Sequence, residues 1–134
     1  MNAGARLLLL VAPMLLAAAP GAAAEIPLGF EDVSLWKAGA SDGVTASVAQ
    51  GEGARGPCLC LDFDFHGGGG YATLRRPVSL DFPANWEFRF RIRGEAPPNN
   101  LEFKLVDASG DNVWWLNRRG FEFPPAWRAL SVKK

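Results

Sequence analysis

A strict alternation of apolar and polar side chains is the feature of this sequence that most limits its fold. In residues 86–93 the even positions are apolar and the odd positions are charged. The same period of two recurs in residues 58–65 and 101–106, and no stretch of ten residues has the apolar spacing of an amphipathic helix. Successive side chains of a strand point to opposite faces of a sheet. The sequence therefore predicts an all-β domain.

Turn residues divide this pattern into short strands. We expect strands at residues 30–37, 44–49, 58–65, 71–75 (continued by 77–82), 86–93, 101–106, 113–118 and 127–133. Glycine, proline, asparagine and aspartate are concentrated in the intervening loops at residues 38–43, 50–53, 66–70, 94–100 and 107–112. About eight short strands at this spacing are typical of an antiparallel β-sandwich.

The N-terminal segment differs from the rest of the chain. Arg6 precedes a 13-residue apolar run, residues 7–19, and small residues follow up to Ala24. This order is typical of a secretory signal peptide, and the run is shorter than the roughly 20 residues of a membrane-spanning helix. We therefore predict a signal peptide at residues 1–24, a β-sandwich domain at residues 25–134, a secreted or periplasmic location, and no membrane attachment after cleavage.

Charge and aromatic content narrow the classes of partner. The 14 basic and 14 acidic side chains balance, and loss of Arg6 with the signal peptide would leave a net charge of −1. No basic excess is present to attract nucleic acid. The 9 Phe, 5 Trp and 1 Tyr all follow residue 24, which argues against disorder. We expect a folded domain that does not bind nucleic acid.

The two cysteines, Cys58 and Cys60, lie two residues apart on one predicted strand. Their side chains would share a face with Cα atoms roughly 6.5 Å apart, at the long end of disulfide geometry. Three states stay open: a strained disulfide, a pair of buried apolar thiols, and bonds to segments outside this chain. With His66 as the sole histidine, a zinc site through sulfur is not expected.

Aromatic and polar side chains on the predicted sheet faces suit the binding of sugars. Alternation assigns Trp114 and Leu116 to the core, and Trp115 with Asn117 to the surface. The alternative is that both tryptophans pack inside the sandwich. Arg89 and Arg91 could hydrogen-bond hydroxyls or carboxylates. If residues 86–93 pair with residues 101–106, these arginines share a face with Glu102 and Lys104.

Acidic residues offer further candidates. Asp62 and Asp64 could contact a ligand, but as same-face neighbours on one strand they do not flank a cleft as catalytic carboxylates do. His66, beside four glycines, is interpreted as a loop residue. A structural calcium ion could use Glu31, Asp32, Asp107 and Asp111, although residues 107–112 lack the spacing of a calcium loop and indicate a hairpin turn. No cofactor is otherwise expected, and nucleophile-elbow and phosphate-loop motifs are missing from the sequence.

Residues 97–119 (PPNNLEFKLVDASGDNVWWLNRR), with residues 121–124 (FEFP) and Trp127, resemble the N-terminal galactose-binding-like domain of bacterial secreted proteins. That domain is related to discoidin (coagulation factor 5/8 type C) and to carbohydrate-binding modules. Residues 29–32 (GFED), Trp36 and residues 61–65 (LDFDF) are similar too. The resemblance implies a jelly-roll β-sandwich that continues beyond residues 127–133. We therefore expect a truncated, incomplete sandwich with exposed apolar side chains around Phe121, Phe123 and Trp127.

These observations favour a non-catalytic carbohydrate-binding module that targets an attached, downstream carbohydrate-active enzyme to polysaccharide or another glycan. The proposed ligand-binding residues are Arg89, Arg91, Glu102, Lys104 and Trp115, with Asp62 and Asp64 as further contributors. The alternative is a structural or protein-interaction β-sandwich without a sugar ligand. A small glycoside hydrolase or lyase that uses Asp64 is the third hypothesis.

Overall fold

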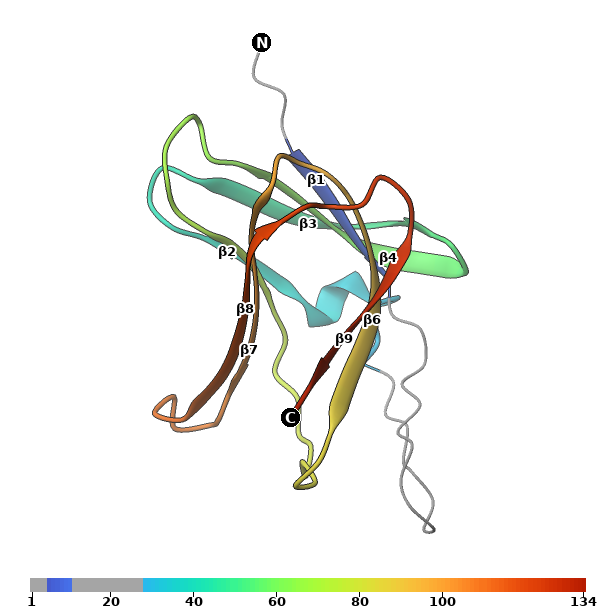
Figure 1. Cartoon of the computed structure of the whole chain (residues 1–134), viewed down its shortest axis with the longest axis vertical. Coiled ribbons are helices and arrows are strands. Elements are labelled where there is room, and N and C mark those ends of the chain that lie inside the picture. Colours follow the sequence, from blue (N-terminus) through green and yellow to red (C-terminus); the bar gives the residue numbers. More distant parts are fainter. Residues whose placement is uncertain (1–4, 11–27) are drawn as a thin grey trace.

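The alternating segments form antiparallel strands in a computed structural model, which describes residues 5–10 and 28–134. A five-stranded sheet has the order β3 (Thr45–Gly53), β4 (Gly56–Asp64), β1 (Ala5–Leu10), β6 (Glu87–Glu95) and β9 (Arg128–Lys133). Two strand pairs accompany it, β2 (Lys37–Ala40) with β5 (Ala72–Arg75), and β7 (Asn99–Val106) with β8 (Val113–Phe121). The prediction of an all-β sandwich is confirmed (Figure 1).

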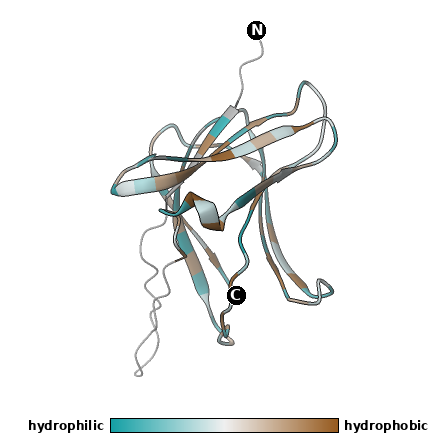
Figure 2. Ribbon diagram, turned by 180° about the vertical axis from the view of Figure 1, so that it is seen from behind, coloured by the Kyte–Doolittle hydropathy of each residue, from teal (hydrophilic) through white to brown (hydrophobic). Residues whose placement is uncertain are grey.

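The core lies between the inner face of β6 and the hairpin formed by β7 and β8. Trp86 packs edge-on against Trp114 with ring centroids 4.7 Å apart, and Phe88 lies 4.7 Å from Phe103. In Figure 2, hydrophobic and hydrophilic colours alternate along the strands, as expected when one face of each strand packs on a core. The buried members of this cluster are Leu7, Leu61, Trp86, Phe90, Ile92, Phe121 and Val132.

Most predicted strands are confirmed with shifted ends, but the segment between Phe30 and Ala40 was predicted wrongly. A 3-10 turn, η1 (Val33–Leu35), stands where we expected a strand, and β2 begins at the end of that expected strand and continues through residues 38–40, where we expected a loop. The Asp32 carboxylate accepts hydrogen bonds from the backbone N and the hydroxyl of Ser34, and such local bonds compete with strand formation.

Two smaller corrections concern residues 50–53 and 77–82. The first segment continues β3 up to the Gly53–Gly56 pair, so that the hairpin turn is Ala54 and Arg55. The second segment is not a strand, and it is bounded by Pro77 and Pro83, which lack the backbone N–H that a ladder needs.

The predicted signal peptide falls only partly on described residues. Residues 1–4 and 11–24 lie outside them, and β1 comes from its residues 5–10. This strand lies between β4 and β6 and is antiparallel to both. Leu7, on β1, is buried in the core with an exposed fraction of 6%. The signal peptide stays a prediction, but the fold as described uses part of it as a central strand.

The aromatic residues near the end of the chain are not exposed as we expected. Phe121 is buried and packs edge-on against Phe123 with centroids 5.2 Å apart, and Trp127 packs on the two cysteines. Phe123 also lies next to Gly94, which belongs to β6, the strand that pairs with β1. The expectation of an exposed apolar edge here was wrong, because these rings close over the sheet that β1 completes.

Gly94 permits a close contact between Leu7 and Phe123. A Cβ at this position would lie 3.0 Å from the Phe123 Cβ and 3.1 Å from Leu7 Cδ1. We expect Gly94→Ala to lower the free energy of unfolding by about 1–3 kcal/mol, because the added methyl group overpacks the core. Urea denaturation measures this difference. Gly69→Ala is the control, since a Cβ there meets nothing within 4 Å, and equal losses in both variants would contradict the packing argument.

Candidate functional site

The outward surface of the β7–β8 hairpin gathers one exposed tryptophan and several polar groups. The pairs Lys104–Trp115, Glu102–Asn117 and Val106–Val113 lie side by side across the two strands. We call these six residues the outer hairpin face. Trp115 is 54% exposed, whereas Trp114 points inward against Trp86 and Phe103. The predicted inward and outward directions of the two tryptophans are confirmed.

Polar contacts hold the side chains around the Trp115 ring. Lys104 Nζ lies 5.1 Å from the ring centroid and 2.8 Å from Glu102 Oε2. Asn117 Nδ2 donates a hydrogen bond to Glu102 Oε1 at 3.3 Å. The ion pair is partly exposed, so it contributes little to stability. Its effect is to keep an ammonium, a carboxylate and an amide beside an accessible aromatic ring.

The turn at the tip of the hairpin holds the two strands in register. Asp107 accepts hydrogen bonds from the Ser109 hydroxyl at 2.7 Å, from the Gly110 backbone N at 3.0 Å and from Asn112 Nδ2 at 2.6 Å. Gly110 has a positive φ of 81°, which favours glycine. The predicted turn is confirmed, and the Asp107 carboxylate is engaged by its own loop.

These hydrogen bonds lower the pKa of Asp107 to about 2, with the largest effect from Ser109 and the next largest from Asn112. Because the folded pKa lies below the unfolded value of about 3.9, the charged carboxylate stabilises the turn above pH 4. That contribution is lost as the pH falls through about 2. NMR titration of the Asp107 carboxyl carbon should give a midpoint near 2. Ser109→Ala should raise the pKa, and an ordinary midpoint in the unmodified chain would contradict the hydrogen-bond geometry.

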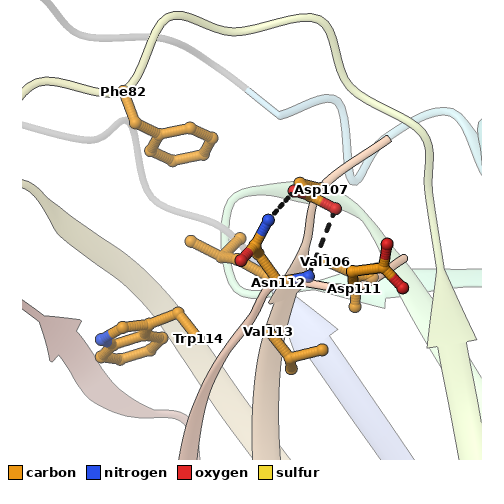
Figure 3. A pocket seen from close by; sticks show the side chains of 8 residues that line it. Phe82, Val106, Asp107, Asp111, Asn112, Val113 and Trp114 are labelled. Atoms are coloured by element: carbon orange, nitrogen blue, oxygen red, sulfur yellow. Dashed lines mark hydrogen bonds between the residues drawn. The ribbon is translucent and has the colours of Figure 1, made fainter. Parts of the chain in front are cut away.

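A hollow of about 560 Å³ lies between the hairpin tip and Phe82. Phe82 faces Asn112 and Trp114 across it, with the Asp107–Asn112 hydrogen bonds at its rim (Figure 3). The hollow is open to solvent, with apolar walls and a polar rim formed by Asp107, Asp111 and Asn112. Phe82 was not among the predicted site residues, because the sequence does not show that residues 77–82 lie beside the tip of the hairpin. Its lining residues are Phe82, Leu105, Val106, Asp107, Asp111, Asn112, Val113 and Trp114.

The predicted surface that combines the arginines with Glu102 and Lys104 does not form. β6, which carries Arg89 and Arg91, pairs with β1 and β9 rather than with β7. Phe88 of β6 packs against Phe103 of β7, so that the polar faces of these two strands point away from each other. Arg89 forms an ion pair with Glu87 at 2.7 Å. The hypothesis of one shared face is therefore wrong.

Asp62 and Asp64 lie on β4, away from the outer hairpin face. Asp62 Oδ1 is 3.4 Å from Arg6 Nε. Asp64 accepts a hydrogen bond from the His66 backbone N at 2.7 Å, and the His66 ring contacts Thr45 Oγ1 at 3.2 Å. Both carboxylates have local partners from their own sheet and the adjoining loop, and neither lines the hollow beside Phe82.

Both cysteines are fully buried free thiols, and Trp127 packs against them. The strained disulfide does not form, and the two thiols are buried side by side as the second of the three states predicted. Burial raises the pKa of the Cys58 thiol, and the neighbouring Cys60 raises it further. The thiolate is the reactive form of cysteine, so Cys58 is poorly suited to nucleophilic chemistry.

The described residues contain no group of three or more His, Cys, Asp or Glu side chains that could hold a metal ion. Of the residues considered for calcium, Asp32 and Asp107 accept hydrogen bonds from their own turns. Within residues 5–10 and 28–134, no helix is long and apolar enough to cross a membrane.

Comparison with protein-family models, with curated proteins and with solved structures finds no match to this chain. The likeness to galactose-binding-like domains therefore stays a prediction from the residues quoted above.

Proposed function

We propose that this chain is a non-catalytic carbohydrate-binding domain of a secreted or periplasmic protein, and that the outer hairpin face is its sugar-binding surface. The observation that carries the proposal is the exposed Trp115 ring, with Lys104, Glu102 and Asn117 beside it. A pyranose ring offers an apolar C–H face that stacks on an aromatic ring, and its hydroxyls accept and donate hydrogen bonds. The outer hairpin face supplies a partner for each of these groups.

The form of this surface indicates its ligand class and affinity. An open two-stranded face can contact an extended polysaccharide from one side, whereas an enclosed pocket would select a free sugar. Because such a face buries little of the ligand, binding at a single site should be weak. A jelly-roll topology and an attached carbohydrate-active enzyme are further parts of the proposal, taken from the resemblance of residues 97–119.

The positions of the two β4 carboxylates also favour binding over catalysis. Asp62 and Asp64 come from one strand, and they do not flank a cleft as the two carboxylates of a glycoside hydrolase do. Activity of the chain on polysaccharide that disappears in Asp64→Asn would instead support the hydrolase or lyase hypothesis.

Calorimetric titration of the full chain with a panel of soluble plant and bacterial polysaccharides tests the proposal. We expect heat of binding for at least one polysaccharide, with chemical-shift changes confined to the outer hairpin face in a parallel NMR experiment. A folded sample that binds no member of the panel at millimolar ligand would contradict it. Shifts that map to β4 or β6 would reject the outer hairpin face as the site.

The second candidate is a protein-interaction sandwich. Val106 and Val113 are 57% and 51% exposed at the tip of the outer hairpin face, and they extend the apolar surface of Trp115. Such a patch also suits a protein partner. Loss of the Val106 and Val113 side chains should weaken protein docking but should leave sugar stacking on Trp115 largely unchanged.

A further inference from the structure

The middle strand of the five-stranded sheet comes from the segment that the sequence identifies as a removable signal. β1 pairs with β4 from Ala5 to Leu9 and with β6 from Arg6 to Leu10. We propose that the exported domain, once residues 1–24 are removed, presents an open slot between β4 and β6 that binds an extended segment of a partner polypeptide. This inference rests on the export included in the proposed function, but not on sugar binding.

The two edges of the slot stand too far apart in the described sheet to pair with each other. β4 and β6 are each antiparallel to β1, so they run parallel to each other. Without β1 they would stand two strand spacings apart, roughly 10 Å. Both edges would then expose backbone N–H and C=O groups that β1 now pairs, and such edges are templates for an added strand.

The inner side of the slot requires an apolar residue. Leu7 is buried with Leu61 and Ile92 in the core, and its Cδ1 lies close to Gly94. Removal of Leu7 would expose Leu61 and Ile92, and Gly94 has no side chain to cover the gap. An occupant with a large aliphatic side chain at the Leu7 register would restore this burial.

The outer side of the slot favours a cation. Arg6 lies opposite Asp62 on β4 and Glu95 on β6 in the strand register. Its Nε is 3.4 Å from Asp62 Oδ1 and donates to Cys60 Sγ at 2.9 Å. Without Arg6, the two carboxylates would flank an empty position. The slot therefore selects a segment in which a basic residue precedes an aliphatic one.

The occupant must be a polypeptide segment that is free of a fold of its own. Strands β2 to β9 are already paired within the described residues, so that insertion of any of them would break existing ladders. A second copy of the exported domain would have lost β1 as well. We therefore assign the slot to an extended basic–aliphatic segment of another protein rather than to a copy of this chain.

The full chain itself supplies the probe, because its two methionines are Met1 and Met14. Cyanogen bromide under denaturing conditions cuts after both methionines, and the two resulting peptides, residues 2–14 and 15–134, are refolded together, with the uncut chain as reference. We expect the peptide of residues 2–14 to co-elute with residues 15–134 and to raise their unfolding midpoint in a concentration-dependent manner. Hydrogen exchange should show that the bound peptide protects the β4 and β6 amides that face β1, whereas the amides that pair with β3 and β9 are protected in both states.

Substituted peptides test the two sides of the slot. Arg6→Glu places a third acid between Asp62 and Glu95 and should bind at least about tenfold more weakly. The affinity of the Leu7→Asp peptide should be roughly 10- to 100-fold lower, because the substitution removes the buried aliphatic side chain. Asn2→Glu changes the charge outside β1 and should bind like the unmodified peptide.

Separate elution of the peptide, an unfolding midpoint that it does not change, or failure of the cut chain to refold when the uncut chain does would each overturn the inference. N-terminal sequencing of the exported protein provides a second check, since retention of residues 5–10 would mean that the slot is filled by the chain itself. Sugar titration of the uncut chain is independent of these outcomes, so failure of the slot and failure of the proposed function can be distinguished.

Discussion

Replacement of Trp86 by alanine is expected to cause the largest loss of stability, about 3–5 kcal/mol in the free energy of unfolding. Trp86 is 7% exposed and lies where the five-stranded sheet meets the β7–β8 hairpin. Its ring packs edge-on against Trp114 at 4.7 Å and against Phe82 at 5.9 Å between centroids. Alanine would leave a cavity between the two layers that these rings join.

Chemical denaturation followed by circular dichroism measures this loss. If the variant does not fold, Trp86→Phe keeps most of the apolar volume and should retain a cooperative transition with a smaller loss. Tyr71→Ala is the matched control, because Tyr71 is an aromatic residue with 54% exposure and should change the free energy of unfolding by less than about 0.5 kcal/mol. Similar losses for Trp86→Ala and Tyr71→Ala would contradict the assignment of Trp86 to the core.

Replacement of Trp115 by alanine is expected to have the largest effect on binding, with polysaccharide affinity reduced at least about tenfold. The change removes the stacking platform but leaves the inner face of β8 intact, since Trp115 points outward. The free energy of unfolding should change by less than about 1 kcal/mol. Calorimetric titration of variant and unmodified chain gives the ratio of affinities.

Two variants separate stacking from other effects. Trp115→Phe retains an aromatic ring and should recover part of the affinity, whereas Tyr71→Ala removes an exposed ring outside the outer hairpin face and should retain all of it. Unchanged affinity in Trp115→Ala, with binding intact in the unmodified chain, would move the sugar site elsewhere. Loss of affinity in Tyr71→Ala would indicate that the surface around Tyr71, just before β5, contributes to the site.

The strands that were predicted well are those in which local pattern and tertiary packing agree. In β6 and β7 every second side chain is apolar and faces the core, so that alternation alone identified them. Local chemistry also made the turn at Asp107 predictable. Residues 30–36 were missed because a carboxylate–backbone hydrogen bond of Asp32 outweighed an apolar pattern that favoured a strand.

The candidate site was predicted only in part, for a physical reason. Alternation gives the direction of a side chain relative to its own strand, and it correctly placed Trp115 outward with Lys104 and Glu102 on the partner strand. It cannot give the order of strands in a sheet, which depends on long-range pairing. Arg89 and Arg91 were therefore grouped with residues that lie on the other side of the sandwich, and the contribution of Phe82 to the hollow was missed.

The sequence by itself determined the all-β class, the inward and outward faces of its main strands and the turn at residues 107–112, because each depends on neighbours in the chain. Tertiary structure alone decided that β6 pairs with β1 and β9, that Trp127 covers the two thiols, and that residues 5–10 lie between β4 and β6. These features depend on which distant surfaces bury the most apolar area together. An apolar segment with one arginine is compatible with both a signal peptide and a central strand, and its place in the sheet depends on its pairing with β4 and β6.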